Sequence, residues 1–333
     1  MAFQGNLTQS RPTDPPALFQ TGLLFDNIYL QHLAGGLDHP ERPERLADIQ
    51  NALRREGLLQ SLDRIEPRVA TKADLALAHS KSYVALVDKE LSDLLELSQL
   101  STGDTLVSPK SLDVAKLAAG GILQAVDCVM AGKIKRAFCA VRPPGHHATR
   151  DRGMGFCIFN NVAVAARYIQ RAHGLKQVLI VDWDYHHGNG TQDIFYEDDS
   201  VFYFSTHHLG AYPGTGRPTE TGAGKGAGTT LNVPLPAGAG DAQILEAFQN
   251  KLIPAARAFR PEFVLISAGF DAMRNDLLGQ FDVTPDGFAA ITRSVVGLAG
   301  ECCEGRVVSV LEGGYQLGGL GESVVAHVRA VAS

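Results

Sequence analysis

The chain has 333 residues, 45% of them apolar, so it can bury a sizeable core in one large domain or two ordinary ones. Its 30 basic and 36 acidic residues give a net charge of −6, which argues against a direct nucleic-acid partner. No apolar run reaches the roughly 18 residues of a membrane span, and no secretory pattern opens the sequence. The five cysteines form no C-x-x-C pair, so a disulfide scaffold is not expected either. We expect a cytoplasmic protein without a membrane partner.

Residues 1–20 are proline-rich and show little periodicity, so we expect a flexible N-terminal arm there. From residue 21 to residue 333 no linker-like stretch or repeat interrupts the chain, which indicates a single domain. Apolar positions recur with helical spacing in residues 43–56, 111–131, 161–172, 241–253 and 285–302. Short apolar runs typical of buried strands alternate with them, at residues 137–141, 178–181, 201–204, 263–267 and 306–311. This alternation predicts an α/β fold with a mostly parallel central sheet and helices on both faces.

Four of the five predicted strands are followed directly by side chains that suit acid–base or metal chemistry. In chain order these are His146 and His147, then Asp182, Asp184 and His186, then Asp271, and finally Tyr315. In open parallel sheets, ligands bind beyond the carboxyl ends of the strands. We therefore expect these four separate stretches to meet at one site.

The segment after the second of these strands suggests a metal centre. In an extended chain, Asp182, Asp184 and His186 share one face because side chains alternate. An Asp and a His two residues apart, with Asp271 from another strand end, would form an open site with two carboxylates and one imidazole, which zinc accepts. The alternative is that the aspartate caps a helix and the histidine is satisfied by hydrogen bonds.

Adjacent histidines alone are weak evidence for catalysis, but Pro143, Pro144 and Gly145 place His146 and His147 on a defined loop. Neutral histidine suits general acid–base work. Tyr315 follows two glycines, and it is either a surface residue on a turn or a donor to a developing oxyanion.

Other residues that attract notice are assigned no chemistry. His187, His207 and His208 are read as structural or rim residues. Cys157 lies in an apolar run, so we expect it to pack rather than react. Residues 214–228 are rich in glycine but lack the lysine–hydroxyl ending of a phosphate loop, so we expect an active-site or surface loop.

The sequence resembles the histone deacetylase superfamily, including its bacterial deacetylase-like amidohydrolases and acetylpolyamine amidohydrolases. The matching motifs, in family order, are HPERPER (39–45), RPPGHHA (142–148), GFCIFNNVAVAA (155–166), VDWDYHHGNGTQ (181–192), SAGFDA (267–272) and LEGGY (311–315). Asn189 and the GFDA form are more similar to class II than to class I, where aspartate is common at the Asn189 position. The resemblance covers residues from about 20 to 325, and it implies a single-domain arginase–deacetylase fold.

The resemblance also implies roles for particular residues. Asp184, His186 and Asp271 match the ligands of one zinc ion per chain. His146 and His147 match the tandem histidines, with Asp182 and Asn189 as their respective partners and His147 as the acid–base residue. Tyr315 matches the tyrosine that polarises the carbonyl. The chemistry so implied is hydrolysis of an acyl-lysine amide, and the same ligands would tolerate Fe²⁺ or Co²⁺.

Further residues match the family's substrate channel and its monovalent-cation sites. Phe156 and Tyr212 fall where two aromatic residues line the channel, although phenylalanine is common at the second position, and Asp104 falls near the rim. One K⁺ or Na⁺ site matches the backbone of Asp182, Asp184 and His186 together with Ser205. A second resembles Phe195, Asp198 and Val201.

Three alternatives to an acyl-lysine deacetylase remain open from the sequence. A polyamine deacetylase would use acidic residues at the mouth, but Leu278 stands where one polyamine-selective branch has glutamate. An arginase-like dimanganese ureohydrolase would need further aspartate ligands. A catalytically silent acyl-lysine binder would not need both histidines and Tyr315. The expected partner is an acylated lysine peptide or protein, or a small N-acyl amine, and a homo-oligomer is possible.

Overall fold

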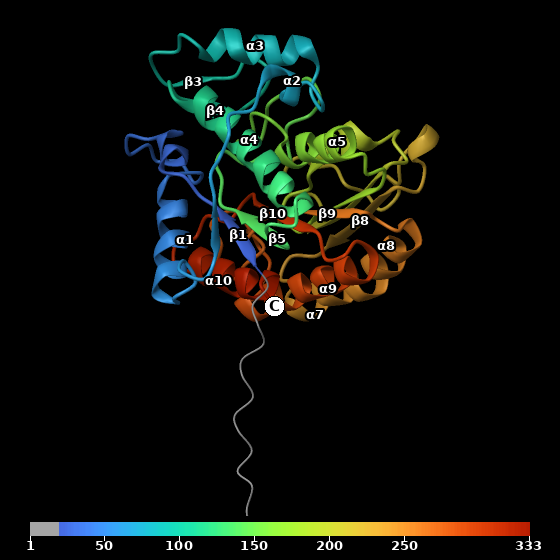
Figure 1. The fold of residues 1–333 in the computed structure, drawn as a ribbon. Helices are drawn as coiled ribbons and strands as arrows, with labels where there is room; N and C mark the ends of the chain where they lie inside the picture. The colour runs from blue at the N-terminus through green and yellow to red at the C-terminus, as the bar shows by residue number, and fades with distance from the viewer. Residues whose placement is uncertain (1–19) are drawn as a thin grey trace, which may run out of the picture.

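The computed structural model describes residues 20–333, which form an eight-stranded parallel sheet between two layers of helices (Figure 1). The strands run in the order β2-β1-β5-β10-β9-β6-β7-β8, and all neighbouring pairs are parallel. Their bounds are β1 Thr21–Leu24, β2 Asp63–Ile65, β5 Arg136–Cys139, β6 Val178–Asp182, β7 Val201–His208, β8 Thr230–Leu235, β9 Phe263–Ala268 and β10 Val307–Leu311. Two further short strands, β3 Ser98–Gln99 and β4 Leu106–Val107, form a separate antiparallel hairpin.

The helices cover both faces of this sheet. Their bounds are α1 Glu44–Arg55, α2 Lys72–Leu75, α3 Lys81–Leu91, α4 Ser111–Met130, α5 Asn161–His173, α6 Asn189–Phe195, α7 Asp241–Ala247, α8 Ile253–Phe259, α9 Pro285–Cys302 and α10 Gly319–Val331. Two 3₁₀ turns, Asn27–Gln31 and Gly224–Gly226, and a π-helical turn, Phe248–Leu252, complete the described elements. Helices α4 and α5 lie on one face, whereas α1, α7, α9 and α10 lie on the other (Figure 1). No helix in the described part of the chain is long and apolar enough to cross a membrane.

The predicted α/β class, with its parallel sheet covered on both faces, is confirmed. All five predicted strands are present with bounds shifted by a few residues, and four of the five predicted helices match α1, α4, α5 and α9 closely. The fifth, predicted over residues 241–253, is instead divided into α7, the π-helical turn and α8. Pro254 lies in the first turn of α8 and has no N–H to donate backward, so the regular helix cannot run through it. The predicted N-terminal arm lies outside the described residues, apart from Gln20.

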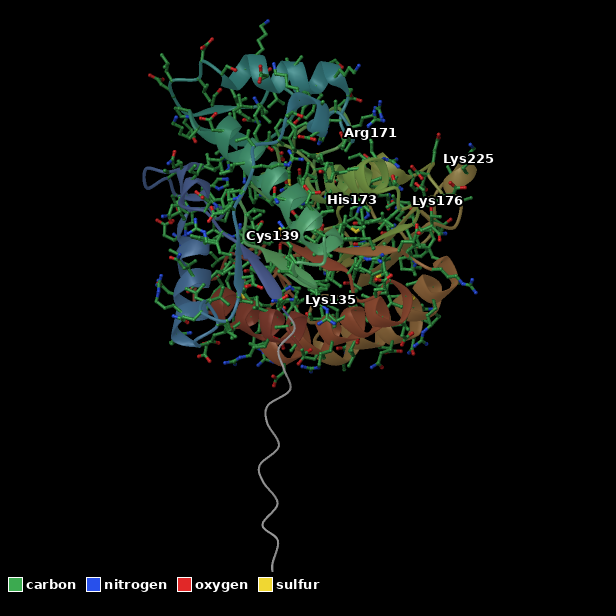
Figure 2. The ribbon with its side chains drawn as sticks, in the orientation of Figure 1. Lys135, Cys139, Arg171, His173, Lys176 and Lys225 are labelled. Carbon is green, nitrogen blue, oxygen red and sulfur yellow. The ribbon has the colours of Figure 1, made fainter. Side chains whose placement is uncertain are left out.

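Local signals explain where several helices begin and end. The side chain of Asn160 accepts a hydrogen bond from the Ala163 backbone at the start of α5, and Gly174 ends that helix with a φ of 72°. Arg171 and His173 lie in its last turn (Figure 2), where cations are favoured by the helix dipole. Thr284 caps the start of helix α9, where its side chain accepts a hydrogen bond from Gly287 N.

A buried cluster of charged side chains connects helix α1 to the sheet. Glu41 accepts hydrogen bonds from the guanidinium groups of Arg142, just after β5, and of Arg45 in α1. All three side chains are fully buried. Burial alone would raise the pKa of Glu41, but Arg142, His32 and Arg45 lower it to about 2. Glu41 is therefore ionised at neutral pH and balances two buried arginines.

We expect Glu41→Gln to lower the free energy of unfolding by about 3–5 kcal/mol, because it leaves the two arginines without their counter-charge. The folded-state pKa lies below the ordinary 4.5, so the contribution is complete above pH 4.5 and is lost as the pH falls toward 2. The free energy of unfolding can be measured by denaturant titration, followed by the fluorescence of the single tryptophan, Trp183, which is buried. Glu301→Gln, which changes an exposed pair with Arg257, is the control. Equal stability of the Glu41 variant and the wild type at pH 7 would contradict this account.

Candidate functional site

The four strands whose ends carry reactive side chains are consecutive in the sheet. Strands β5, β10, β9 and β6 stand side by side in that order at its centre. Because they are parallel, the segments that follow them leave the sheet at the same edge. The remaining predicted strand, β7, lies next to β6 and outside this group. The predicted convergence of the four stretches is therefore a consequence of strand order.

Asp184, His186 and Asp271 form a compact group in which one ligand atom from each residue lies within 4.8 Å of the others. His186 Nδ1 lies 3.3 Å from Asp184 Oδ1 and 3.0 Å from Asp271 Oδ2. Ligand atoms about 2.0–2.1 Å from a tetrahedral zinc ion are separated by about 3.3 Å. Two buried carboxylates and one imidazole at this spacing fit a single divalent cation.

The chain reaches this arrangement differently from the predicted extended face. Strand β6 ends at Asp182, and two successive turns follow, in which Asp184 N donates to Asp182 Oδ1 and His186 N donates to Asp184 Oδ1. The aspartate side chains compete with the strand ladder for backbone N–H groups and bend the chain. Asp182 consequently faces His146, whereas Asp184 and His186 face Asp271.

The backbone close to the two carboxylates leaves no room for other side chains. Gly313 N donates to Asp184 Oδ2 at 2.8 Å, and Tyr185 N donates to Asp271 Oδ1 at 2.9 Å. A Cβ on Gly313 would collide with a carboxylate oxygen of both aspartates. Burial and the negative charge of Asp184 raise the pKa of Asp271. A cation between the two carboxylates would relieve this repulsion.

Each of the tandem histidines has its own partner. His146 Nδ1 donates to Asp182 Oδ2 at 3.1 Å, and His147 Nδ1 donates to Asn189 Oδ1 at 2.8 Å. Burial alone would lower the pKa of His146, but Asp184 and Asp182 raise it to about 10. Burial and the neighbouring imidazoles lower the pKa of His147 well below its usual value. The surroundings of the two rings therefore differ, because carboxylates favour the protonated form of His146 and burial favours the neutral form of His147.

Glu312 is a site residue to which the sequence analysis assigned no role. Its Oε2 accepts from the backbone N–H groups of Gly145 and His146, and its Oε1 accepts from the hydroxyl of Ser267. Glu312 thereby fixes the loop that carries both histidines against the end of β10. Its position directly before the two glycines was visible in the sequence, but nothing in the sequence revealed its partners.

Tyr315 is buried, so the reading of it as a surface residue on a turn is wrong. Only 4% of it is exposed, and its ring lies under the guanidinium of Arg45, 4.8 Å from Cζ to the ring centre. Gly314 precedes it with a φ of 118°, a conformation that favours glycine. Arg45 also donates to the carbonyl oxygens of Glu312 and Gly314, both at 2.6 Å. The first helix therefore holds the segment that carries this tyrosine.

These groups surround a pocket of about 310 Å³. Its walls are formed by Asp104, His147, Gly155, Phe156, His186, Tyr212, Leu278 and Tyr315. Asp104 lies in the turn of the β3–β4 hairpin, accepts from Gly155 N, and accepts from the Tyr212 hydroxyl at 3.1 Å. The structure thus brings together in one pocket the four residues expected to contact the substrate, Asp104, Phe156, Tyr212 and Leu278.

A sequence profile of the histone deacetylase domain matches residues 39–331. The chain belongs to the histone deacetylase family. "Histone deacetylase 10, chloroplastic" from Oryza sativa subsp. japonica is 43% identical over 306 residues, which cover 88% of this chain and 69% of the relative. A "Probable deacetylase" from Archaeoglobus fulgidus is 40% identical over 301 residues, which cover 90% of this chain and 82% of the relative.

The chain is also similar to a human family member and to a solved structure. The human "Polyamine deacetylase HDAC10" is 43% identical over 300 residues, or 87% of this chain and 44% of that protein. The crystal structure of the HDA15 HD domain superimposes with a TM-score of 0.88 at 42% identity, covering 94% of this chain and 90% of the other. The arginase–deacetylase fold implied by the resemblance is thus confirmed.

Several other polar residues of this histone deacetylase family member have structural contacts. His187 binds Thr215 and Gln192, and His207 binds Ser205 and the Gly216 carbonyl, so both hold the glycine-rich loop. His208 stacks on Tyr185 with ring centres 5.3 Å apart.

The buried cysteines near the sheet are poor nucleophiles. Cys139 lies inside the molecule in β5 (Figure 2), the thiol of Cys157 donates to the Gly155 carbonyl, and neither cysteine is exposed. Burial raises the pKa of both thiols, which disfavours the thiolate.

The residues expected at the monovalent-cation sites occupy two places beside β6 and β7. Ser205 pairs in register with Asp182, next to the segment that contains Asp184 and His186. Phe195 ends α6, Val201 begins β7, and Asp198 between them donates its N–H to the Phe195 carbonyl. Cation binding at either place stays a prediction.

We expect Asp184→Ala and Asp271→Ala each to lose bound metal and activity together, because two remaining protein ligands hold a divalent cation poorly. Metal analysis of the purified wild type should show about one transition-metal ion per chain. Asp282→Ala, which removes an exposed carboxylate paired with Arg274, is the matched control and should keep its metal. Full metal content in either site variant would exclude that residue as a ligand.

Proposed function

We propose that this chain is a zinc-dependent amidohydrolase that removes acetyl or other short acyl groups from lysine side chains of proteins or peptides. The observation that carries the proposal is the composition of the pocket. His147, His186 and Tyr315 all line it, and His186 also belongs to the group formed with Asp184 and Asp271. Asp184, His186 and Asp271 would hold the zinc ion. When bound, zinc supplies a Lewis acid that lowers the pKa of a water molecule toward roughly 7.

In this proposal His147 moves the protons of the reaction. Its Nδ1 donates to Asn189, so Nε2 is the accepting nitrogen of the neutral ring. Its lowered pKa keeps the ring neutral and ready to take the proton of the attacking water. The same nitrogen then returns a proton to the leaving amine, which yields a carboxylate and a free amine.

His146 has an electrostatic and orienting role in the proposal. It lies between Asp182 and Asp184, whose charges raise its pKa to about 10 despite its burial. The hydrogen bond from Nδ1 to Asp182 favours the protonated ring, and a protonated ring cannot accept a proton from water. Its ring centre lies 4.0 Å from that of His147, so its positive charge helps to keep His147 neutral.

Tyr315 is proposed to donate its hydroxyl to the carbonyl oxygen as negative charge develops there. Burial is the largest cause that raises the pKa of Tyr315, so its hydroxyl keeps its proton at neutral pH. Its ring also forms an edge contact with Phe156, with ring centres 6.0 Å apart, on the wall of the pocket. Phe156 and Tyr212 would enclose the apolar part of the acyl-lysine side chain.

Acetylpolyamines are the alternative substrates, because a polyamine deacetylase is among the relatives. A second amine on the substrate would need an acidic group at the mouth of the pocket. Among the residues that the structure describes, Asp104 is the only acid in the pocket wall, and its two oxygens already accept hydrogen bonds from Gly155 and Tyr212. Leu278, on the same wall, is apolar and 38% exposed. These two features favour acyl-lysine over a polyamine.

An activity panel tests the substrate class directly. It compares acetyl-lysine peptides and longer acyl-lysine peptides with acetylputrescine and acetylspermidine. We expect kcat/KM to be at least about tenfold higher for a peptide, which corresponds to about 1.4 kcal/mol of transition-state binding. A tenfold preference for either acetylpolyamine would identify the alternative, and no hydrolysis of any of the four by metal-loaded protein would contradict the proposed function.

Tyr315→Phe is expected to lower kcat by about 10²–10³, because it removes one oxyanion donor while the ring and the metal ligands remain. KM should change much less, since the hydrogen bond strengthens only as charge develops. Steady-state kinetics on the best substrate of the panel provide the measurement. Tyr83→Phe is a suitable control, because that hydroxyl donates to the Ile158 carbonyl away from the pocket wall. Near wild-type kcat for Tyr315→Phe would show that the tyrosine only packs.

A further inference from the structure

Asp276 joins the two segments that carry Tyr315 and Leu278. Its Oδ2 accepts from the backbone N–H groups of Tyr315, at 2.7 Å, and Gln316, at 3.0 Å. Its Oδ1 accepts from Leu278 N at 2.9 Å and from Gly279 N at 3.3 Å. Asp276 is 8% exposed, and it does not itself line the pocket.

The segment 312–316 is therefore held from two sides by opposite charges. The Arg45 guanidinium binds its carbonyl oxygens at Glu312 and Gly314, and Asp276 binds its N–H groups at Tyr315 and Gln316. Gly314, between these contacts, has a backbone conformation that permits easy rotation when it is not restrained. Without the carboxylate of Asp276, the hydrogen bonds from Arg45 to the carbonyl oxygens of Glu312 and Gly314 would remain. The backbone N–H of Tyr315 would lose its hydrogen bond.

We propose that Asp276 is a positioning residue for catalysis, which sets the position of the Tyr315 hydroxyl relative to the pocket wall at Leu278. This inference rests on the proposed role of Tyr315 as oxyanion donor. All hydrogen bonds given for the carboxylate are to backbone N–H groups, and in this scheme it acts through the backbone of Tyr315; its charge also raises the pKa of the neighbouring Asp271. Each of the two Asp276 oxygens accepts two hydrogen bonds from backbone N–H groups. A side chain at this position must therefore accept hydrogen bonds at both of its terminal atoms.

Asparagine tests this requirement with almost no change in size. An amide accepts at its oxygen but presents an NH₂ group at the other position, where it would oppose two backbone N–H donors. Whichever way the amide is turned, one of the two segments loses both of its hydrogen bonds. A displacement of about 1 Å at a catalytic group lowers the rate by about 10²-fold.

We expect Asp276→Asn to lower kcat at saturating substrate by about 10- to 100-fold when Tyr315 is present. In the Tyr315→Phe background, the same change should lower kcat by less than about twofold, because the group that Asp276 positions is already absent. Saturating substrate separates this effect from changes in binding at Leu278. Asp282→Asn is the matched control, since that carboxylate lies in the same loop region but is exposed and paired with Arg274.

This double-mutant cycle of Asp276→Asn and Tyr315→Phe distinguishes failure of the inference from failure of the proposed function. If Tyr315→Phe alone retains wild-type kcat, the proposed role of Tyr315 fails. If Tyr315→Phe is impaired but Asp276→Asn lowers kcat by the same factor in both backgrounds, Asp276 acts independently of Tyr315 and the inference is overturned. Metal content and thermal unfolding of each variant establish that the comparison is between folded, metal-loaded proteins.

Hydrogen exchange of the unmodified protein provides a second test that does not depend on a variant folding. The amides of Tyr315, Gln316 and Leu278 should exchange at least about 100-fold more slowly than that of Leu95, which is 89% exposed. Exchange of the Tyr315 and Gln316 amides at the rate of Leu95 would show that the carboxylate does not hold this segment, and it would overturn the inference.

Discussion

The burial of two neighbouring carboxylates, Asp184 and Asp271, is the constraint on which the site depends. Each is at most 1% exposed, and an unpaired buried charge costs several kcal/mol after relaxation of its surroundings. The imidazole of His186 and backbone N–H groups, including that of Gly313, offset part of this charge. A bound cation would neutralise the remainder. Gly313 is required beside the carboxylates because a Cβ there would collide with both of them.

Buried ionisable side chains from distant elements hold the loops that carry the reactive groups. Glu312 holds the backbone of the histidine loop, Arg45 holds the carbonyl oxygens next to Tyr315, and Asp276 holds its N–H groups. Hydrogen bonds to an ionised partner are stronger than those between neutral groups. These hydrogen bonds restrain loops that begin at the ends of short strands.

Part of the fold could be read from local pattern, and part could not. Strands β6, β9 and β10 are continuous apolar runs, and α9 opens on Thr284 and Pro285, so both kinds of element were predicted correctly. Strand β2 has only three residues with two of them exposed, and β8 contains a proline, so neither shows a strand pattern. They exist because neighbouring strands supply hydrogen-bond partners, which no local window of sequence contains.

By itself, the sequence determined the α/β class, the strand ends at which chemistry collects, and the identity of the metal-ligand and histidine residues as candidates. Only the tertiary structure decided that β10 and β9 stand between β5 and β6. It also revealed Glu312, Arg45 and Asp276 as supports of the site. The physical reason is separation along the chain, because Arg45 and Gly314 are 269 residues apart yet joined by a hydrogen bond of 2.6 Å. Such a contact leaves no periodicity or spacing in the sequence, and it arises only when the sheet brings distant strand ends together.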